Sequence, residues 1–307
     1  MHVAVCIVGY RNVADIVGCL EALARSSHSD FEVQICENGG RKAYRILSDS
    51  LPKQLPAGQV VVVTEATHNL GYAGGVNVCI RAAPDADAWW VLNPDTVPDD
   101  RALEELLNRL ADGDCELVGG VLHGADGRVQ TLGGRWRPWL ARAEAIGRGL
   151  PLSETKAYSL RLDFVSGASM LVSKVWIQVV GLMREDYFLY CEEVEWCLRG
   201  QQRGMRLGFA AQAYVFHNQG ATTGSARSLR SRPTLPVYLD ERNKILATRD
   251  CNPYLLPIAL PAALMLIILR FSGRGAWRQT WAGVRGWSAG LMNERGMPRV
   301  KRFRAKL

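Results

Sequence analysis

The sequence lacks the cysteine spacing of zinc and redox sites. Its eight cysteines never form Cys-x-x-Cys, and most lie inside apolar runs, where cysteine behaves as a small hydrophobic residue. This predicts a reducing compartment, with neither structural zinc nor disulfides. The first residues also lack a basic segment and a small-residue cleavage site, so we expect no signal peptide and a cytoplasmic catalytic part.

A glycine-rich nucleotide turn is missing after the first apolar run. A dehydrogenase would carry G-x-G-x-x-G at that place, but residues 9–12 read GYRN. A nucleotidylyltransferase would also have a glycine-rich first turn. Both classes are therefore disfavoured, although the chain is globular in composition, with 48% hydrophobic and 22% charged residues.

Acidic residues are scarce at the C-terminal end. From residue 270 onward the sequence contains one acidic residue, Glu294, and ten basic residues: Arg270, Arg274, Arg278, Arg285, Arg295, Arg299, Lys301, Arg302, Arg304 and Lys306. This part has a net charge of +9, and the first 269 residues carry 37 − 10 = 27 basic and 30 − 1 = 29 acidic groups, or −2. A basic tail follows a nearly neutral body. The sequence has no recognisable nucleic-acid-binding module, so we expect no nucleic-acid partner.

The body alternates between two kinds of segment. Apolar runs predict strands at 3–8, 32–36, 60–64, 88–92 and 117–122, and the stretches between them predict helices near 13–25, 42–50, 73–82 and 100–111. This pattern predicts an α/β fold, a mostly parallel central sheet with helices on both faces. Ligands of such sheets bind beyond the carboxyl ends of the strands.

Polar and glycine-rich segments follow those strand ends. In chain order they are "GYRN" (9–12), "ENGG" (37–40), "ATHNLGYAGGVN" (66–77) and "NPDT" (93–96). With "FVSGASMLV", "YFLYCEEVEWCLRGQQRG" and "VFHNQG" further along, they resemble the successive blocks of family 2 glycosyltransferases, and most of all the rhamnosyltransferase-like branch. The resemblance covers about residues 1–250 and implies the GT-A fold, a Rossmann-like fold of nucleotide-diphospho-sugar transferases. Residues 251–307 would form a helical, membrane-associating extension.

The resemblance implies a site for a nucleotide-diphosphate sugar. Asp95, the last acid of a D-x-D motif that has Asn93 in first place, would bind Mg²⁺ or Mn²⁺ as cofactor, and His217 would complete the metal site. The other implied donor contacts are Gly9, Tyr10, Arg11, Glu37, Asn69, Gly71 and Asn77. Simpler interpretations remain open: residues 93–96 as a turn that caps the next helix, Glu37 as a solvated loop acid, and His217 as a surface residue.

The resemblance places the catalytic base at Glu193. Glu192 and Glu193 begin a predicted helix, and acids in a first turn are favoured by the helix dipole, so we expect them to stay ionised near neutrality. The alternative is a pair of helix-end acids, with a structural Glu195–Arg199 pair. Residues 164–168 read as a strand with a glycine break, and Gly167, Ala168 and Glu192 would border the sugar and acceptor. Residues 221–232 could close as a lid, and Arg184 departs from the family's usual Asp.

An uncharged run occupies residues 253–269 and contains three prolines. We expect a helix that lies in or dips into the membrane surface, followed by arginines and tryptophans that meet lipid head groups. A buried core helix or a dimer helix is the alternative, and the sequence leaves the oligomeric state open. The predicted location is the inner face of the cell membrane.

The sequence therefore predicts an inverting glycosyltransferase of cell-surface glycan synthesis. The donor implied by the resemblance is dTDP-L-rhamnose, and the acceptor is lipid-linked or a polysaccharide. A UDP-sugar donor and a non-catalytic sugar-nucleotide-binding relative are the alternatives.

Overall fold

A computed structural model describes residues 1–157, 161–218 and 228–298. The first 123 residues alternate between strands and helices, and all five strands and four helices predicted from the sequence are confirmed. In order, the elements are β1 (Val3–Gly9), α1 (Val13–Leu23), β2 (Phe31–Glu37), α2 (Arg41–Ser50), β3 (Val61–Glu65), α3 (Gly71–Ala82), β4 (Ala88–Leu92), β5 (Thr96–Pro98), α4 (Ala102–Ala111) and β6 (Leu117–His123).

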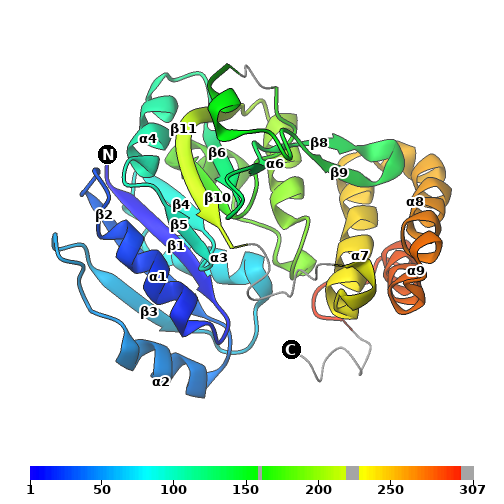
Figure 1. Ribbon diagram of the computed structural model, residues 1–307, viewed down its shortest axis with the longest axis horizontal. Helices are drawn as coiled ribbons and strands as arrows, with labels where there is room; N and C mark the ends of the chain where they lie inside the picture. Colours follow the sequence, from blue (N-terminus) through cyan, green and yellow to red (C-terminus); the bar gives the residue numbers. More distant parts are fainter. Residues whose placement is uncertain (158–160, 219–227, 299–307) are drawn as a thin grey trace.

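One large sheet runs through the molecule in the order β3-β2-β1-β4-β10-β6-β11-β5, with β7 paired to β6 (Figure 1). Strands β1 to β4 pair in parallel, as do β6 and β11. The later strands are β7 (Val129–Thr131), β10 (Ser169–Ser173) and β11 (Leu207–His217). Because β10 runs antiparallel between β4 and β6, the sheet is mixed but mostly parallel.

Helices cover both faces of this sheet, as the continuous apolar strands predict. Along β1, Val3, Val5 and Ile7 pack into a core with α1 and α4, whereas Ala4, Cys6 and Val8 pack into a second core with α3 and α6. This alternation follows from the two-residue period of a strand. All eight cysteines are buried.

The segment before β10 corrects one prediction. Residues 164–168 are not a strand: Phe164 forms an isolated bridge, and regular pairing starts only at Ser169. The Ser166 hydroxyl accepts a hydrogen bond from the Ala168 N–H (3.3 Å), and the Ser166 carbonyl accepts one from Ser169 (3.3 Å). Local bonds of this kind compete with sheet ladders and produce a turn here.

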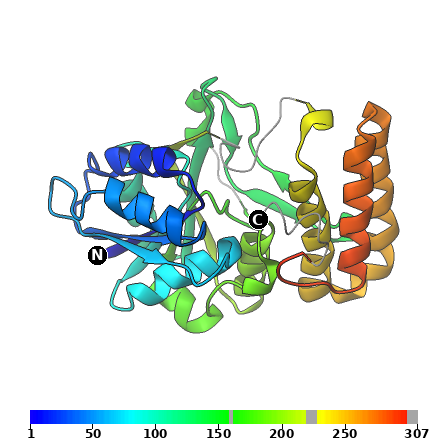
Figure 2. The same ribbon diagram turned by 90° about the horizontal axis from the view of Figure 1, so that it is seen from below.

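The C-terminal helices form a layer beside the sheet (Figures 1 and 2). Its members are α7 (Thr234–Cys251), α8 (Leu256–Phe271) and α9 (Trp277–Leu291), preceded on the sheet side by α5 (Lys174–Val180) and α6 (Glu192–Gln202). A hairpin of β8 (Gly134–Arg137) and β9 (Arg142–Ala145) reaches from the sheet domain to α8. The short 3-10 turns are η1 (Pro138–Leu140), η2 (Leu152–Ala157), η3 (Glu185–Tyr187), η4 (Leu229–Ser231), η5 (Pro253–Leu255) and η6 (Ser272–Arg274).

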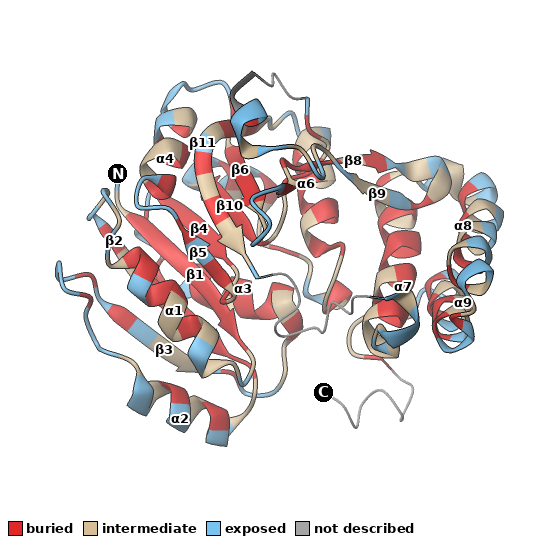
Figure 3. Ribbon diagram, viewed as in Figure 1, coloured by how far each residue is buried: buried red, intermediate tan, exposed pale blue. Residues whose placement is uncertain are grey.

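The three helices differ in burial (Figure 3). Helix α7 is mostly buried, and α9 lies close to it because Gly286 and Gly290 stand at the contact: a Cβ on Gly286 would lie 2.2 Å from the Tyr238 carbonyl oxygen. Helix α8 belongs to a 22-residue stretch, Pro253–Arg274, that is long and apolar enough to cross a membrane by length and composition. Only 22% of its apolar window is buried.

Candidate active site

The predicted donor residues begin at the carboxyl ends of β1 and β2, where Gly9 and Glu37 are register partners. Glu37 is fully buried, so a solvated loop acid is ruled out at this position. Its Oε1 accepts hydrogen bonds from the N–H groups of Gly39 (2.6 Å) and Arg11 (3.1 Å). Its Oε2 is buried and has no partner among the described residues. Because buried polar atoms are nearly always bonded, this oxygen suits a donor group of a ligand.

Tyr10 and Arg11 lie beside this carboxylate. The Arg11 guanidinium carbon is 5.0 Å from the centre of the Tyr10 ring, and Arg11 Nε donates to the Gly39 carbonyl (3.2 Å). Arg11 has a φ of 57°, a left-handed conformation uncommon for a residue with a side chain. The Arg11 guanidinium lies over the Tyr10 ring.

The loop that leads into α3 is held by two neighbouring segments. Asn69 Oδ1 accepts from the Gly71 N–H (3.0 Å), and the Tyr72 N–H donates to the Phe188 carbonyl (2.6 Å). Gly71 has φ +73°, and a Cβ there would lie 2.1 Å from the Phe188 oxygen, so only glycine fits.

Asn77, further along α3, is buried. Its amide bonds to the Met183 backbone and to Glu185. Asn77 thus supports the loop before α6, and its bonds leave no side-chain donor or acceptor group directed at a nucleotide.

Asp95 and His217 come together where β5 pairs with β11. His217 Nε2 is 3.4 Å from Asp95 Oδ1, and the two side chains are only 11% and 7% exposed. The second ring nitrogen, Nδ1, lies 3.1 Å from Gln130 Oε1, and Gln130 Nε2 donates to the His217 carbonyl (2.7 Å). His217 is therefore not a surface residue. The turn at residues 93–96 leads into β5, so it is not the cap of α4, which begins at Ala102.

This pair fits a divalent cation by its donor set. One carboxylate and one imidazole, with the far ring nitrogen fixed by a hydrogen bond, is a common arrangement for a metal ligand histidine. Mg²⁺ and Mn²⁺ bind few protein ligands when a diphosphate supplies further oxygens. No cluster of three or more His, Cys, Asp or Glu side chains suitable for a metal occurs within residues 1–157, 161–218 and 228–298. A cation at this place would consequently depend on oxygens of the bound nucleotide.

Tyr72 connects Asp95 with the predicted base. The Tyr72 hydroxyl donates to the Gly167 carbonyl (2.6 Å), and a Cβ on Gly167 would be 3.5 Å from Glu193 Cβ. Burial raises the pKa of Tyr72 well above its ordinary value, and the charges of Glu192, Glu193 and Asp95 raise it further. The charges of the predicted metal ligand Asp95 and of the predicted base Glu193 therefore act on the same side chain.

The segment just before β10 is hydrogen-bonded to the turn that carries Asp95. The Asn93 N–H donates to the Ala168 carbonyl (3.0 Å), which joins the D-x-D-like turn to the segment that carries Gly167. The structure thus gathers Asn93, Asp95, Gly167, Ala168 and Glu193 into one region.

Glu192 and Glu193 begin α6, as predicted, but the expectation that both stay ionised near neutrality is wrong. Burial raises the pKa of Glu193 to about 7, against the lowering effect of the backbone N–H groups of the first turn, and Asp240 raises it further. Burial, with the charge of Glu193, raises the pKa of Glu192 well above its ordinary value. Desolvation thus outweighs the helix dipole. Glu192 Oε2 has no hydrogen-bond partner among the described residues.

The loop before these acids is clamped by α7. Phe188, Tyr190 and Cys191 all have positive φ (68°, 75° and 63°), which strains residues with side chains. Asn243 Nδ2 lies 2.8 Å from each of the carbonyl oxygens of residues 187, 189 and 190. One buried amide thereby holds the three carbonyls that set the start of α6.

Four functional residues were missed in the sequence: Tyr72, Gln130, Asp240 and Asn243. The segment "DERNK" (240–244) contains a sequence signal for Asp240 and Asn243. Consecutive residues on a helix point about 100° apart, so an unbroken polar run on a packed helix cannot all face solvent. Glu241, Arg242 and Asn243 are indeed buried.

Two other predictions concern neighbouring segments. Arg184, which departs from the family pattern, pairs with Asp186 (2.6 Å) and with Asp250 at the end of α7 (2.8 Å), so it ties the catalytic loop to the helical layer. Of the proposed lid, 221–232, residues 221–227 lie outside the described residues.

The fold is that of the GT-A class, with polar side chains at the strand ends and an acid at the start of a following helix. Residues 2–234 match the family model described as "Glycosyltransferase like family 2", and the chain belongs to this family. A hexosyltransferase of low-salt glycan biosynthesis, Agl10 of Haloferax volcanii, is 27% identical over 186 residues, which are 59% of this chain. The match spans 58% of that relative's length.

Two groups of solved structures show the same fold. A mannosyltransferase from Pyrobaculum calidifontis in complex with GDP-Man and Mn²⁺ superposes with a TM-score of 0.56 at 15% identity, covering 95% of this chain and 88% of the other. TarS of S. aureus, residues 1–349 with UDP-GlcNAc, gives a TM-score of 0.55 at 12% identity and covers 96% and 93%. None of these proteins is named as a rhamnosyltransferase, so the predicted branch of the family is not confirmed.

Proposed function

We propose that the chain transfers a hexosyl group from a nucleotide-diphosphate sugar to a glycan acceptor, with inversion at the anomeric carbon. The observations that support this proposal are the pairing of Asp95 with His217 (3.4 Å) and the packing of Glu193 against Gly167, in the segment whose Ala168 carbonyl accepts from Asn93. A diphosphate held at the first pair would leave the sugar between it and the base. The curated relative, a hexosyltransferase, is consistent with this reaction class.

The donor would bind along the strand ends. Glu37 Oε2 would accept from the nucleobase, the Tyr10 ring would pack on it, and Gly9 keeps the space beside the carboxylate open, because a Cβ there would lie 2.6 Å from Oε2. Asp95 and His217 would hold Mg²⁺ or Mn²⁺, which supplies Lewis-acid stabilisation of the leaving diphosphate. The similar mannosyltransferase structure contains Mn²⁺.

Glu193 would act as the general base. A base works best when its pKa lies near the working pH, and the half-buried Glu193, with a pKa of about 7, meets that condition. It would take the proton from the acceptor hydroxyl as that oxygen bonds to the anomeric carbon and the nucleotide diphosphate departs from the opposite face. Glu192, buried behind it, would stay largely protonated and border the sugar.

We further propose dTDP-L-rhamnose as the donor and a lipid-linked or polysaccharide acceptor, on the strength of the sequence blocks. A turnover assay with dTDP-L-rhamnose, UDP-GlcNAc and GDP-mannose tests both the reaction and the donor. Release of nucleoside diphosphate from one donor, dependent on Glu193, is the expected result. If wild type releases no more diphosphate than Glu193→Gln from any donor, the catalytic proposal is overturned in favour of a sugar-nucleotide-binding protein.

Residues 253–298 would bind the inner face of the cell membrane. The outer faces of α8 and α9 expose large apolar side chains, among them Met265, Leu269, Trp277 and Trp281, at 56 to 69%. Exposed tryptophans and arginines beside an apolar helix are typical of an interfacial segment. The basic residues after 298 lie outside the described residues.

A further inference from the structure

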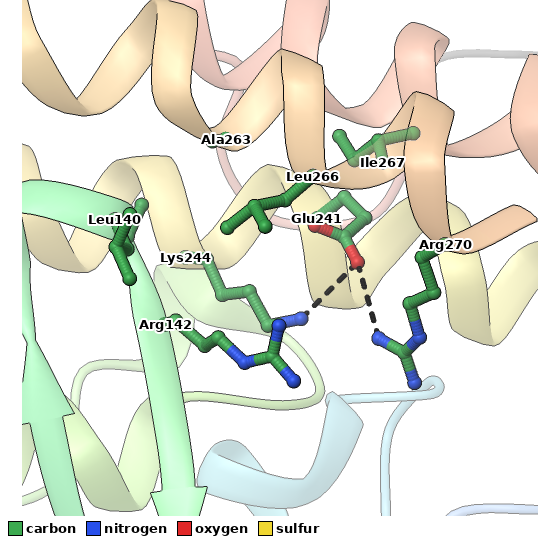
Figure 4. Close-up of a pocket in the computed structure, with 9 residues that line it drawn as sticks. Leu140, Arg142, Glu241, Lys244, Ala263, Leu266, Ile267 and Arg270 are labelled. Carbon is green, nitrogen blue, oxygen red and sulfur yellow. Dashed lines mark hydrogen bonds and ion pairs between the residues drawn. The ribbon is translucent and has the colours of Figure 1, made fainter.

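A groove separates the β8–β9 hairpin from α8. Its open part has a volume of about 480 Å³ and is lined by Arg142, Leu229, Leu266, Leu269, Arg270 and Arg274. A narrow inner part of about 20 Å³ continues from it toward α7, since Arg142, Leu266 and Arg270 line both (Figure 4). The open part has the volume of a small-ligand site, and the inner part has room for a group about as large as a water molecule.

Positive charge collects in this groove without enough counter-charge. Four cationic side chains, Arg142, Lys244, Arg270 and Arg274, line it together with Glu241, and Asp240 pairs with Lys244 beside it, which gives 4 − 2 = +2. Glu241 Oε1 is already shared by Lys244 Nζ (3.1 Å) and Arg270 (3.8 Å). Within the described part of the chain, the side chains of Arg142 and Arg274 form no ion pair. Like charges this close repel, and a bound anion would remove the repulsion.

The inner end of the groove is lined by a buried charged side chain and is not open surface. Lys244 is 9% exposed, and Figure 4 shows its side chain with those of Arg142 and Arg270 directed into the same space. Burial alone would lower the pKa of Lys244, but the carboxylates of Asp240 and Glu241 raise it above its ordinary value. The lysine is therefore charged at neutral pH.

One wall of the groove is apolar. Leu266 and Leu269 line it from α8, and Leu269 is 60% exposed. Leu269 also belongs to the outer face of α8, which exposes Met265 and Ile268. An apolar chain leaving the groove would thus continue onto the surface that we propose for the membrane.

The groove is linked to the base through α7. Lys244 Nζ lies 2.7 Å from Asp240 Oδ2, and Asp240 is one of the charges that act on Glu193. Asp240 thus pairs with Lys244 of the groove and also acts through its charge on Glu193.

On the basis of the proposed transfer reaction, we propose that this groove binds the phosphate or diphosphate of a lipid-linked acceptor. Arg142, Arg270 and Arg274 would contact phosphate oxygens, and Leu266 and Leu269 would contact the first units of the lipid. The acceptor sugar would extend past Asp240 to Glu193. An acceptor phosphate fits better than a bulk lipid head group, because the groove leads inward to a buried lysine and toward the base.

Calorimetric titration of the full-length chain in detergent with farnesyl diphosphate tests this assignment. EDTA is present throughout, so that a metal-dependent donor site does not contribute. Wild type should bind farnesyl diphosphate more tightly than inorganic pyrophosphate, and farnesol should bind weakly. Arg142→Ala and Arg274→Ala should each weaken binding of farnesyl diphosphate about tenfold or more, as expected for loss of a charge-assisted contact. Leu269→Ala should weaken binding of farnesyl diphosphate but not of pyrophosphate.

Three controls separate the groove from other sites. Arg278→Ala removes an exposed arginine of α9 and should leave binding of farnesyl diphosphate unchanged. Asp95→Ala and Glu193→Gln should bind it like wild type, so the site is measured even if the transfer proposal fails. Wild-type binding of farnesyl diphosphate by both Arg142→Ala and Arg274→Ala would overturn the proposal, as would its loss in Asp95→Ala.

Vesicles distinguish the lipid acceptor from a bulk head group. Arg142→Ala and Arg274→Ala should bind phosphatidylglycerol vesicles about as well as Arg278→Ala does. If the two groove variants lose vesicle binding but keep farnesyl diphosphate, the groove is a membrane head-group site and the proposal is wrong.

Discussion

His217 places Nε2 3.4 Å from Asp95 Oδ1, and the backbone joins the same two segments again, because the Asn218 N–H donates to the Asp95 carbonyl (2.9 Å). Gln130 fixes the ring from its other side. The pair is thus positioned by the sheet before any ligand arrives, as pre-organised metal ligands are.

Metal binding should depend on both residues. Asp95→Ala should abolish Mn²⁺-dependent binding of the nucleotide sugar, and Gln130→Leu should weaken Mn²⁺ affinity about tenfold, because it frees the His217 ring. Titration of Mn²⁺ by electron paramagnetic resonance, with nucleotide present, measures this. Asp99→Ala, an exposed acid on the same segment, is the control. Unchanged Mn²⁺ affinity in Asp95→Ala would exclude the site.

The reaction should report the raised pKa of Glu193. The base must be ionised, so kcat/KM should rise with pH through an acidic limb near 7 and then level off. Glu193→Gln should lower turnover about 100-fold to 10,000-fold while donor affinity stays the same. The matched control is Glu21→Gln, at an exposed position on α1. An acidic limb near 4.5 instead would mean that another group, or an exposed carboxylate, is the base.

The stability of the folded protein should also depend on pH through the ionisation of Glu193. The folded-state pKa of Glu193 (about 7) lies above its ordinary value of 4.5, so the folded state binds more protons between these values and stability falls as pH rises from about 4.5 to about 7. Glu193→Gln should therefore melt near the wild-type temperature at pH 4 and about 2 °C or more above it at pH 8. Differential scanning calorimetry at both pH values checks this. A lower melting temperature at pH 8 would contradict it.

Asn243 should act as a positioning residue. Asn243→Ala removes the side-chain donor of the Leu189 and Tyr190 carbonyls and leaves the Tyr187 carbonyl with Arg242, which should cost about 1 to 3 kcal/mol of stability. Because the loop sets the start of α6, kcat should fall by about tenfold or more, with little change in the donor KM. Thr248→Ala, which also removes a buried polar group of α7, is the control for stability alone. Equal kcat in the two variants would make Asn243 merely structural.

Membrane binding should depend on exposed tryptophans. Trp277→Ser with Trp281→Ser should reduce co-flotation with phosphatidylglycerol vesicles and leave the melting temperature almost unchanged, because both rings lie mostly in solvent. Truncation near residue 250 is a poorer test. It would uncover the face of α7 that packs on α9 and remove the Gly296 carbonyl that accepts from the buried Arg242 (2.8 Å). Undiminished flotation of the double variant would refute the interfacial role.

The sequence predicted the sheet domain well, because its strands are continuously apolar and its strand ends carry the polar blocks. The family resemblance also singled out Glu37, Asp95, Glu193 and His217, whose roles stay predictions. The ionisation of Glu193 could not be predicted from a first-turn position, since it depends on burial and on Asp240 from α7. Residues 164–168 were predicted as a strand because they belong to an apolar run, and this run does not reveal that Ser166 forms a turn there.

The helical character of the C-terminal region was predicted, but α7 and its packing were not, for a related reason. Helix α7 falls within the residues that resemble the family domain, yet it packs with α9, and only tertiary contact shows that its polar residues are internal. The proposed domain boundary at residue 250 lies at the end of this helix. The close approach of α7 and α9 depends on glycines of α9, whose role appears only when the opposing backbone is known.

The clamp on the catalytic loop also has a consequence for biosynthesis. Asn243 and Arg242 hold the Tyr187 carbonyl, and Arg242 in turn bonds to the Gly296 carbonyl. A nascent chain can therefore complete the hydrogen bonds that hold this loop only after Gly296 has been translated, when the helices proposed to reach the membrane have already been synthesised.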